Sequence, residues 1–173
     1  MMSDRNRLLG LDDRQLLAEC EFDRYRASGP GGQKRNKTDS AVRLRHLATA
    51  TTVIAADSRS QHQNRARALR RMRQAIALHV RVLIVLDTYT PSAVLADCLG
   101  ESGRLVCSKR NAAYHHVVAE ILDVLHVCGG QVSTAAERFG ISTANLVSFL
   151  KDDEKAWAKV NQMRGAAGLK PLR

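Results

Sequence analysis

The sequence has few aromatic residues and no long hydrophobic run. Phe, Trp and Tyr together make up 4% of its 173 residues, although 45% of the residues are hydrophobic, which is enough for a core. The longest aliphatic run, Val82 to Leu86, is too short to span a bilayer. The N-terminal stretch MMSDRNRLLG also lacks the apolar region of a secretory signal. We therefore expect a cytoplasmic protein with no membrane partner.

Paired cysteine motifs are absent as well. The four cysteines, at positions 20, 98, 107 and 128, have no CxxC spacing, so the sequence indicates neither a zinc ribbon nor a redox pair. Free thiols suit a reducing cytosol. The other residues that could ligate a metal fit no known ligand spacing, and we expect no metal and no cofactor. These residues are Cys107, His115, His116, His126 and Cys128.

Positive charge is present in excess, and it is unevenly distributed. The formal net charge is +10. Residues 1–79 contain 16 Lys or Arg and 8 Asp or Glu, whereas residues 80–173 contain 11 and 9. A soluble chain this basic usually binds a polyanion, most often nucleic acid. We expect the polyanion to contact the first half of the chain.

In the first half of the sequence, apolar and polar residues first alternate, as in β-strands. Farther along, apolar residues recur at the spacing of an α-helix. Cys20 and Phe22 fall on one face of a predicted strand, and "AVRLRHL" and "TTVIAAD" read as an antiparallel pair. From about Ser60 to His79, apolar residues recur at three- and four-residue spacing. This pattern predicts a small antiparallel sheet packed on one long basic helix.

The second half has the pattern of helices. We predict an α+β protein with three parts: the sheet and basic helix over 1–79, a linker with a short helix over 80–110, and an all-α module over 111–173. The module contains a helix-turn-helix-like pair that turns at Gly140. Its predicted core comprises Ile121, Leu125, Leu146, Phe149 and Trp157.

The stretch "RASGPGGQKRNKTDSAV", residues 26–42, carries the strongest chemical signal. Gly31 and Gly32 allow the backbone to approach another molecule without a Cβ in the way. Gln33 offers hydrogen-bond donors but is no proton-transfer base near neutral pH. Catalysis here would position water and stabilise developing charge. The residues alone equally allow a basic hairpin loop that contacts RNA without chemistry.

Residues 20–76 resemble the catalytic domain of bacterial-type class I peptide chain release factors. The matching text is "RASGPGGQ", "NKTDSAVRLRHL" and "RSQHQNRARALRRM", in the same order and at the family's spacing. The resemblance implies hydrolysis of the ester bond of peptidyl-tRNA in the peptidyl transferase centre, with Gly31, Gly32 and Gln33 as the catalytic triplet. It implies that the Gln33 backbone N–H stabilises the transition state while its side chain excludes nucleophiles other than water. It also implies N-methylation of Gln33 by a glutamine methyltransferase.

The resemblance and the charge together predict a set of RNA contacts. Lys34-Arg35 replaces the His-Val often seen after the triplet, and the added charge should favour ribosomal RNA. "HLATATT" replaces the usual "HxPTG" hairpin, so this turn loses its Pro and Gly and its local stability is in question. The predicted contacts are Arg26, Lys34, Arg35, Asn36, Lys37, Arg59, Gln61, Asn64, Arg65, Arg67, Arg70 and Arg71.

Codon-reading signals are missing from the sequence. It contains neither a Pro-x-Thr nor a Ser-Pro-Phe tripeptide, and about twenty residues precede the first predicted strand. The chain therefore resembles the short, codon-independent rescue-type peptidyl-tRNA hydrolases, whose partners would be the ribosome, through large-subunit rRNA, and peptidyl-tRNA. It departs from them where a Lys/Arg-rich tail is typical, because residues 80–173 have a net charge of only +2.

A second GGQ, residues 129–131, lies in a different context. Its two glycines follow a predicted helix, and we expect them to end it. "GGQVSTAAERFGISTANLVSFL" resembles the helix-turn-helix of Fis-type DNA-binding proteins. The second helix carries only Asn145 and a few hydroxyl groups that could contact the edges of DNA bases. This composition disfavours sequence-specific DNA binding. A non-catalytic RNA- or DNA-binding regulator that uses the basic loop and this helix pair remains the alternative function.

Overall fold

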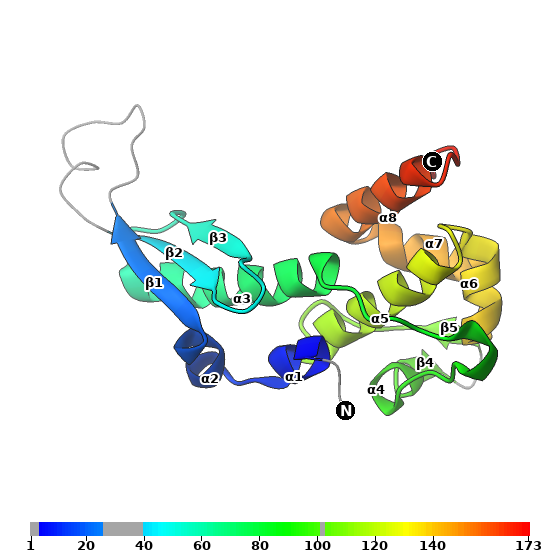
Figure 1. The fold of residues 1–173 in the computed structure, drawn as a ribbon, viewed down its shortest axis with the longest axis horizontal. Helices are drawn as coiled ribbons and strands as arrows, with labels where there is room; N and C mark the ends of the chain where they lie inside the picture. Colours follow the sequence, from blue (N-terminus) through cyan, green and yellow to red (C-terminus); the bar gives the residue numbers. More distant parts are fainter. Residues whose placement is uncertain (1–3, 26–39, 101–102) are drawn as a thin grey trace. The chain divides into compact units, whose positions relative to one another are not determined.

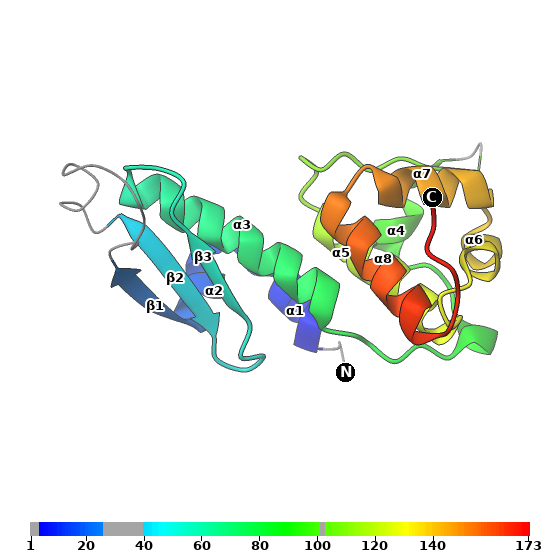
Figure 2. The same cartoon turned by 90° about the horizontal axis from the view of Figure 1, so that it is seen from above.

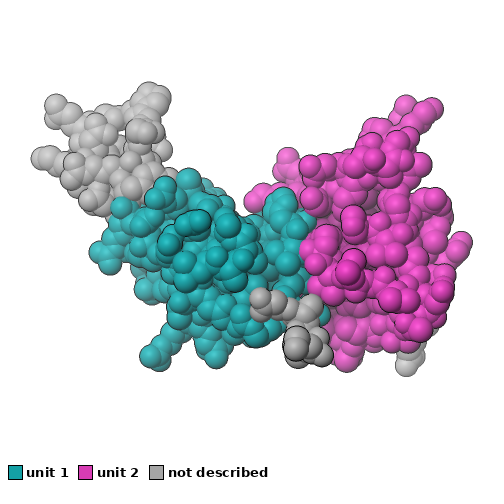
Figure 3. All heavy atoms as spheres, in the orientation of Figure 1, with its two compact units in different colours: residues 1–80 teal, residues 81–173 magenta. Residues whose placement is uncertain are grey.

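The structure, a computed structural model, describes residues 4–25, 40–100 and 103–173. Internal contacts divide the chain into two compact units, residues 1–80 and 81–173, which are described separately (Figure 3). The predicted α+β fold class is confirmed: a three-stranded antiparallel sheet and a long helix are followed by a mainly helical unit. No helix within the described ranges is both long and apolar enough to cross a membrane.

The first unit is a sheet of order β1-β2-β3 with α3 lying along β2 and β3 (Figures 1 and 2). Phe22 of β1 is opposite Leu44 of β2, which in turn is opposite Val53 of β3. The predicted strands and the predicted long helix are confirmed. The elements are α1 (Asp4–Gly10), α2 (Asp13–Ala18), β1 (Cys20–Tyr25), β2 (Ala41–His46), β3 (Thr52–Ala55) and α3 (Gln61–His79).

Apolar alternation on β2 builds the core of this unit. Val42 and Leu44 are fully buried, as are Met72 and Ile76 on the facing side of α3. The Ser60 hydroxyl caps α3 by accepting the Gln63 N–H. Alternate residues of β2 face solvent, so the two faces of the sheet differ in chemistry.

The second unit contains two short strands and five α-helices among its described residues. α5 is its longest helix and carries a broad apolar face that is almost completely buried. The elements are η2 (Leu86–Thr88), α4 (Ala93–Ala96), β4 (Leu99–Gly100), β5 (Arg104–Leu105), α5 (Tyr114–Val127), α6 (Val132–Phe139), α7 (Thr143–Lys151) and α8 (Glu154–Ala166).

The segment expected to be a linker, 80–110, is packed into this unit from residue 81 onward. The Glu120 carboxylate on α5 accepts hydrogen bonds from the Tyr89 hydroxyl and the Ser92 N–H, both at 2.8 Å. Leu95, in the predicted short helix, is fully buried. The segment has its own buried apolar residue and anchoring hydrogen bonds, so it adds to the core of the second unit.

The predicted core of the helical module is confirmed except for its tryptophan. Ile121, Leu125 and Leu146 are fully buried and Phe149 is nearly so. Trp157 is only half-buried, with the Lys151 ammonium over its ring at 6.0 Å from the centroid. The indole therefore lies at the edge of the core.

The second GGQ ends a helix, as predicted. Gly129 and Gly130 follow α5 with φ angles of +59° and +77°, a left-handed conformation that favours glycine. The Gly130 N–H donates to the Leu125 carbonyl at 2.8 Å. Gln131 is the N-cap residue of α6, but its side chain accepts no hydrogen bond from a backbone N–H of that helix. These residues form a connection between helices.

The four cysteines are free thiols. Burial raises the pKa of the Cys20 thiol to about 11, and burial together with the neighbouring Cys98 raises that of Cys107 to about 12. Neither is a thiolate near neutral pH, so neither is an activated nucleophile.

Candidate nucleic-acid interface

The first GGQ lies outside the described residues. So do five of the predicted RNA contacts, Arg26, Lys34, Arg35, Asn36 and Lys37. The structure does describe the two ends of this segment. Tyr25 at the end of β1 is the register partner of Ala41 at the start of β2. β1 therefore ends and β2 begins at the same end of the sheet, so the described residues on either side of the first GGQ lie together.

Asn64 on α3 fastens the returning end of that segment to the helix. Its Nδ2 donates to the Ser40 carbonyl at 2.6 Å and to the Ser58 carbonyl at 2.7 Å, while its Oδ1 accepts the Ser58 N–H at 2.9 Å. The side chain is fully buried. Asn64 was predicted to contact RNA, but both the nitrogen and the oxygen of its amide are hydrogen-bonded inside the protein. Its position is that of a brace between α3 and the end of the GGQ segment.

Two predicted RNA-contacting arginines on α3 share an acidic partner. Arg71 donates to the Asp57 carboxylate at 2.9 Å and also to the Ile54 carbonyl, and Arg67 lies 4.0 Å from the same carboxylate. The hydrogen bond from Arg71 holds the pKa of Asp57 below its usual value. Each arginine stays more than a third exposed. Asp57 thus orients the Arg67 and Arg71 side chains toward solvent. The sequence did not predict this role, because an acidic residue is not expected to support an RNA-binding surface.

The other predicted contacts in this region point into solvent. Arg59, Arg65 and Arg70 are exposed, and no acidic side chain pairs with them in the part of the chain that the structure describes. Gln61, at the start of α3, is half-buried. Residues 57–73 contain six arginines and a single acidic residue, so this surface is strongly positive. Such a surface suits a phosphate backbone.

The outward face of the sheet is charged but balanced. Arg43 is directly opposite Asp23 and pairs with it at 2.6 Å, and Arg45 is opposite Glu21 at 3.2 Å. These cross-strand pairs cancel their charges. Among the described residues of the first unit, the excess of positive charge is therefore greatest on α3 and the residues just before it.

Comparison with known proteins identifies this region. Residues 16–82, which include Gly31, Gly32 and Gln33, match the RF-1 domain family. The predicted resemblance is confirmed. The sheet and α3 fall within this range, so the positive surface and the Asn64 brace both lie in the region that matches the RF-1 domain family.

Three curated relatives share the RF-1 domain region. The chain is 63% identical over 51 residues to peptide chain release factor 2 of Paramagnetospirillum magneticum. It is 62% identical over 52 residues to peptide chain release factor 1 of Leptothrix cholodnii, and 57% identical over 53 residues to that of Polynucleobacter necessarius. These matches cover 30–31% of this chain and 14–15% of the relatives. The chain thus spans only a small part of their length.

Two residues of the helix pair that the sequence offered for base contacts take part in the fold. The Asn145 Oδ1 on α7 accepts the Leu105 N–H of β5 at 2.7 Å, so this side chain ties α7 to the short hairpin. The Ser142 hydroxyl caps α7 by accepting the Asn145 N–H. Asn145 and Ser142 thus each have a structural role.

Proposed function

We propose that this protein hydrolyses the ester bond of peptidyl-tRNA on the ribosome. The observation that carries the proposal is the match of residues 16–82, which include the first GGQ, to the RF-1 domain family, together with 57–63% identity to release factors over 51–53 residues. In the proposed reaction, Gly31 and Gly32 let the backbone approach the ester. The Gln33 N–H stabilises the developing oxyanion while its side chain admits only water. Water attacks the ester carbonyl, and the bond to the tRNA ribose oxygen breaks.

The described part of the RF-1 domain supports this role. Arg59, Arg65 and Arg70 offer charge-assisted hydrogen bonds to rRNA phosphates, and Asp57 orients Arg67 and Arg71 beside them. The Asn64 brace fixes one end of the segment that carries the triplet. Binding and chemistry are thus assigned to neighbouring parts of one small domain.

We further propose that release is codon-independent, in rescue of stalled ribosomes. The sequence contains none of the tripeptides used to read stop codons, and the second unit instead supplies a helical module. The protein would act in the cytosol, and a glutamine methyltransferase would modify Gln33. The Asn145 and Ser142 contacts count against the alternative of a DNA-binding regulator.

The decisive experiment measures release of labelled peptide from ribosome-bound peptidyl-tRNA with an empty A site. Gly32→Ala should slow release by on the order of 100-fold while ribosome binding persists, because the added methyl keeps the backbone from the ester. Gln33→Ala should slow release less, since its backbone N–H survives.

Gln131→Ala is the matched control, because it changes the glutamine of the second GGQ. It should release peptide at the wild-type rate. Release by Gly32→Ala at the wild-type rate would overturn the proposal and leave the first GGQ as an RNA contact without chemistry. Release only with a stop codon in the A site would overturn codon independence alone.

A further inference from the structure

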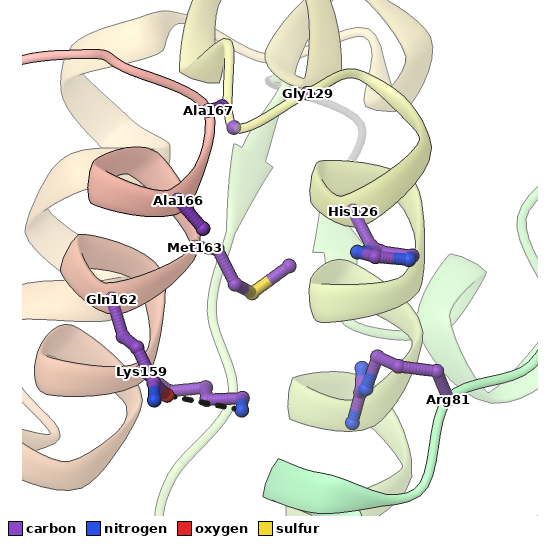
Figure 4. A pocket seen from close by; sticks show the side chains of 9 residues that line it. Arg81, His126, Gly129, Lys159, Gln162, Met163, Ala166 and Ala167 are labelled. Atoms are coloured by element: carbon purple, nitrogen blue, oxygen red, sulfur yellow. Dashed lines mark hydrogen bonds between the residues drawn. The ribbon is translucent and has the colours of Figure 1, made fainter.

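A pocket of about 400 Å³ opens in the second unit beside α5 and α8. Its size is at the lower end of the range for small-ligand sites. Figure 4 shows His126 of α5 and Arg81 on one side, and Lys159, Gln162 and Met163 of α8 on the other. No acidic residue lines it. The lining suits a ligand that is negatively charged and partly apolar.

Lys159 supplies the charge that the pocket does not neutralise. Its Nζ donates to the neutral Gln162 Oε1 at 3.1 Å, and none of the described carboxylates pairs with it. An ammonium has three donors, so two remain for a ligand. Arg81 differs, because its Nη1 donates to the buried Asp123 carboxylate at 2.8 Å. Lys159 is therefore the anion-binding group of the pocket.

The pocket also has apolar lining residues, Met163 and Ala166 of α8. The Met163 side chain extends from α8 toward the His126 imidazole, and Ala166 adds a small apolar side chain beside it (Figure 4). Thioethers make favourable contacts with aromatic rings, and histidine is among the side chains on which RNA bases stack. The Gln162 Nε2 can donate to a base edge.

The chain around this pocket is more basic than the charge of the second half suggests. From residue 155 to 173 there are five Lys or Arg and no Asp or Glu. Of the nine acidic residues after position 80, Asp123 and Asp153 are buried and hydrogen-bonded within the unit. The net charge of the second half includes these two buried carboxylates, and for this reason it pointed to the first half as the contact for a polyanion. The structure reveals a second positive region, on α8.

We propose that this pocket binds one nucleotide of an RNA strand, with the phosphate at Lys159 and the base between Met163 and His126. The choice of an RNA strand as the source of the nucleotide rests on the proposed function. The pocket would give the second unit its own contact with ribosomal RNA, in place of a basic tail.

Methionine labelling tests the proposal directly on the full chain. The chain has four methionines, so ¹³C-methyl labelling gives four signals, and Met163→Leu assigns the one in the pocket. A short single-stranded RNA should shift the Met163 methyl saturably and leave that of Met72, buried in the first unit, unchanged. AMP and inorganic phosphate should bind more weakly.

Lys159→Glu should weaken the binding seen at Met163 by on the order of tenfold. Lys159→Gln should lower the log–log salt slope by about 0.7, the value for one single-strand phosphate. Lys170→Glu is the matched control, because it reverses a charge in the same basic stretch outside the pocket. It should change binding much less.

The proposed site would be overturned if RNA did not shift the Met163 methyl signal. It would also be overturned if Lys159→Glu and Lys170→Glu weakened RNA binding equally. If AMP bound as tightly as RNA, the proposal that the bound nucleotide belongs to an RNA strand would be overturned. The assay contains no ribosome. A negative result in this assay therefore does not bear on the proposed peptide release. Conversely, if Gly32→Ala failed to slow release, the binding measured at the pocket could still be interpreted.

Discussion

The two units of this protein differ in whether they bury any acidic side chain among their described residues. In the first unit, acids such as Asp57 and Asp23 lie at the surface and pair with arginine side chains that remain exposed. In the second unit, Asp123 and Asp153 are buried and accept hydrogen bonds from backbone N–H groups. Asp57 and Asp23 thus arrange cations on the surface of one unit, whereas Asp123 and Asp153 help to assemble the interior of the other.

This difference explains why net charge is a better guide to the first unit than to the second. Surface pairs add little to stability, so the arginines near Asp57 are free to exchange it for phosphate. A buried carboxylate with backbone partners is part of the fold, because removing it leaves donors unsatisfied. Summed charge therefore understates the positive surface around α8.

The largest expected effect comes from removing the buried acid. Asp123→Ala should lower the free energy of unfolding by about 3–5 kcal/mol, because the Val82 N–H loses its acceptor and the Arg81 guanidinium loses its carboxylate. Asp57→Ala, at a carboxylate that is 43% exposed, should lower it by less than about 1 kcal/mol. Urea unfolding followed by the single tryptophan, Trp157, reports on the second unit, and amide exchange in β2 reports on the first. Equal losses would remove the distinction between the units.

The next largest effect is expected where the first unit does bury a polar side chain. Asn64→Ala should destabilise the first unit by about 2–3 kcal/mol, since the Ser58 N–H and two carbonyls lose their partner. Gln63→Ala is the control, an exposed amide one residue earlier, and should change stability by less than about 0.5 kcal/mol. Protection of β2 amides against hydrogen exchange measures both. If Asn64→Ala kept full protection but lost RNA binding, the RNA contact predicted from the sequence would be the correct assignment.

Asn64 also marks the limit of what the sequence could reveal. The alternation at Val42 and Leu44 and the helical spacing of Leu69, Met72 and Ile76 predicted the sheet and α3, because burial of one face imposes a period. The role of Asn64 depends on carbonyls at Ser40 and Ser58 that converge only after folding. Asn64, a polar residue among arginines in the sequence, was therefore predicted to contact RNA.

The second unit was harder to predict for a related reason. The run RVLIV, residues 81–85, is neither helix nor strand. It is held by side chains such as Asp123 and carries Leu83 almost fully exposed. β4 and β5 are two residues each, too short for any alternation to appear. The pocket residues come from α5, α8 and Arg81, a grouping that no local pattern encodes.

A smaller effect separates the two glycines of the second GGQ. Both have positive φ, so alanine at either should cost about 1–2 kcal/mol. A Cβ at Gly130 would also lie 3.0 Å from Cγ and 3.2 Å from Cα of Arg164, whereas one at Gly129 would meet nothing within 4 Å. Gly130→Ala should therefore be less stable than Gly129→Ala by about 1 kcal/mol, measured by Trp157 fluorescence in urea. Equal stabilities would mean that α8 yields readily at this contact.

The smallest expected effect is a gain, in the hairpin of the first unit that has no Pro or Gly. Ala50 has a φ of +53°, which disfavours alanine, and the turn around it is held by the His46 N–H donating to the Thr51 carbonyl at 2.8 Å and by the Thr49 hydroxyl donating to that of Thr51. Ala50→Gly should relieve this strain and raise the free energy of unfolding by about 0.5–1 kcal/mol, after the entropy that glycine adds to the unfolded chain. Ala48→Gly is the matched control, because Ala48 lies in the same turn without positive φ and should gain nothing. Amide exchange of His46 compares the two variants, and a gain in both would mean that the turn is limited by something other than the backbone at Ala50.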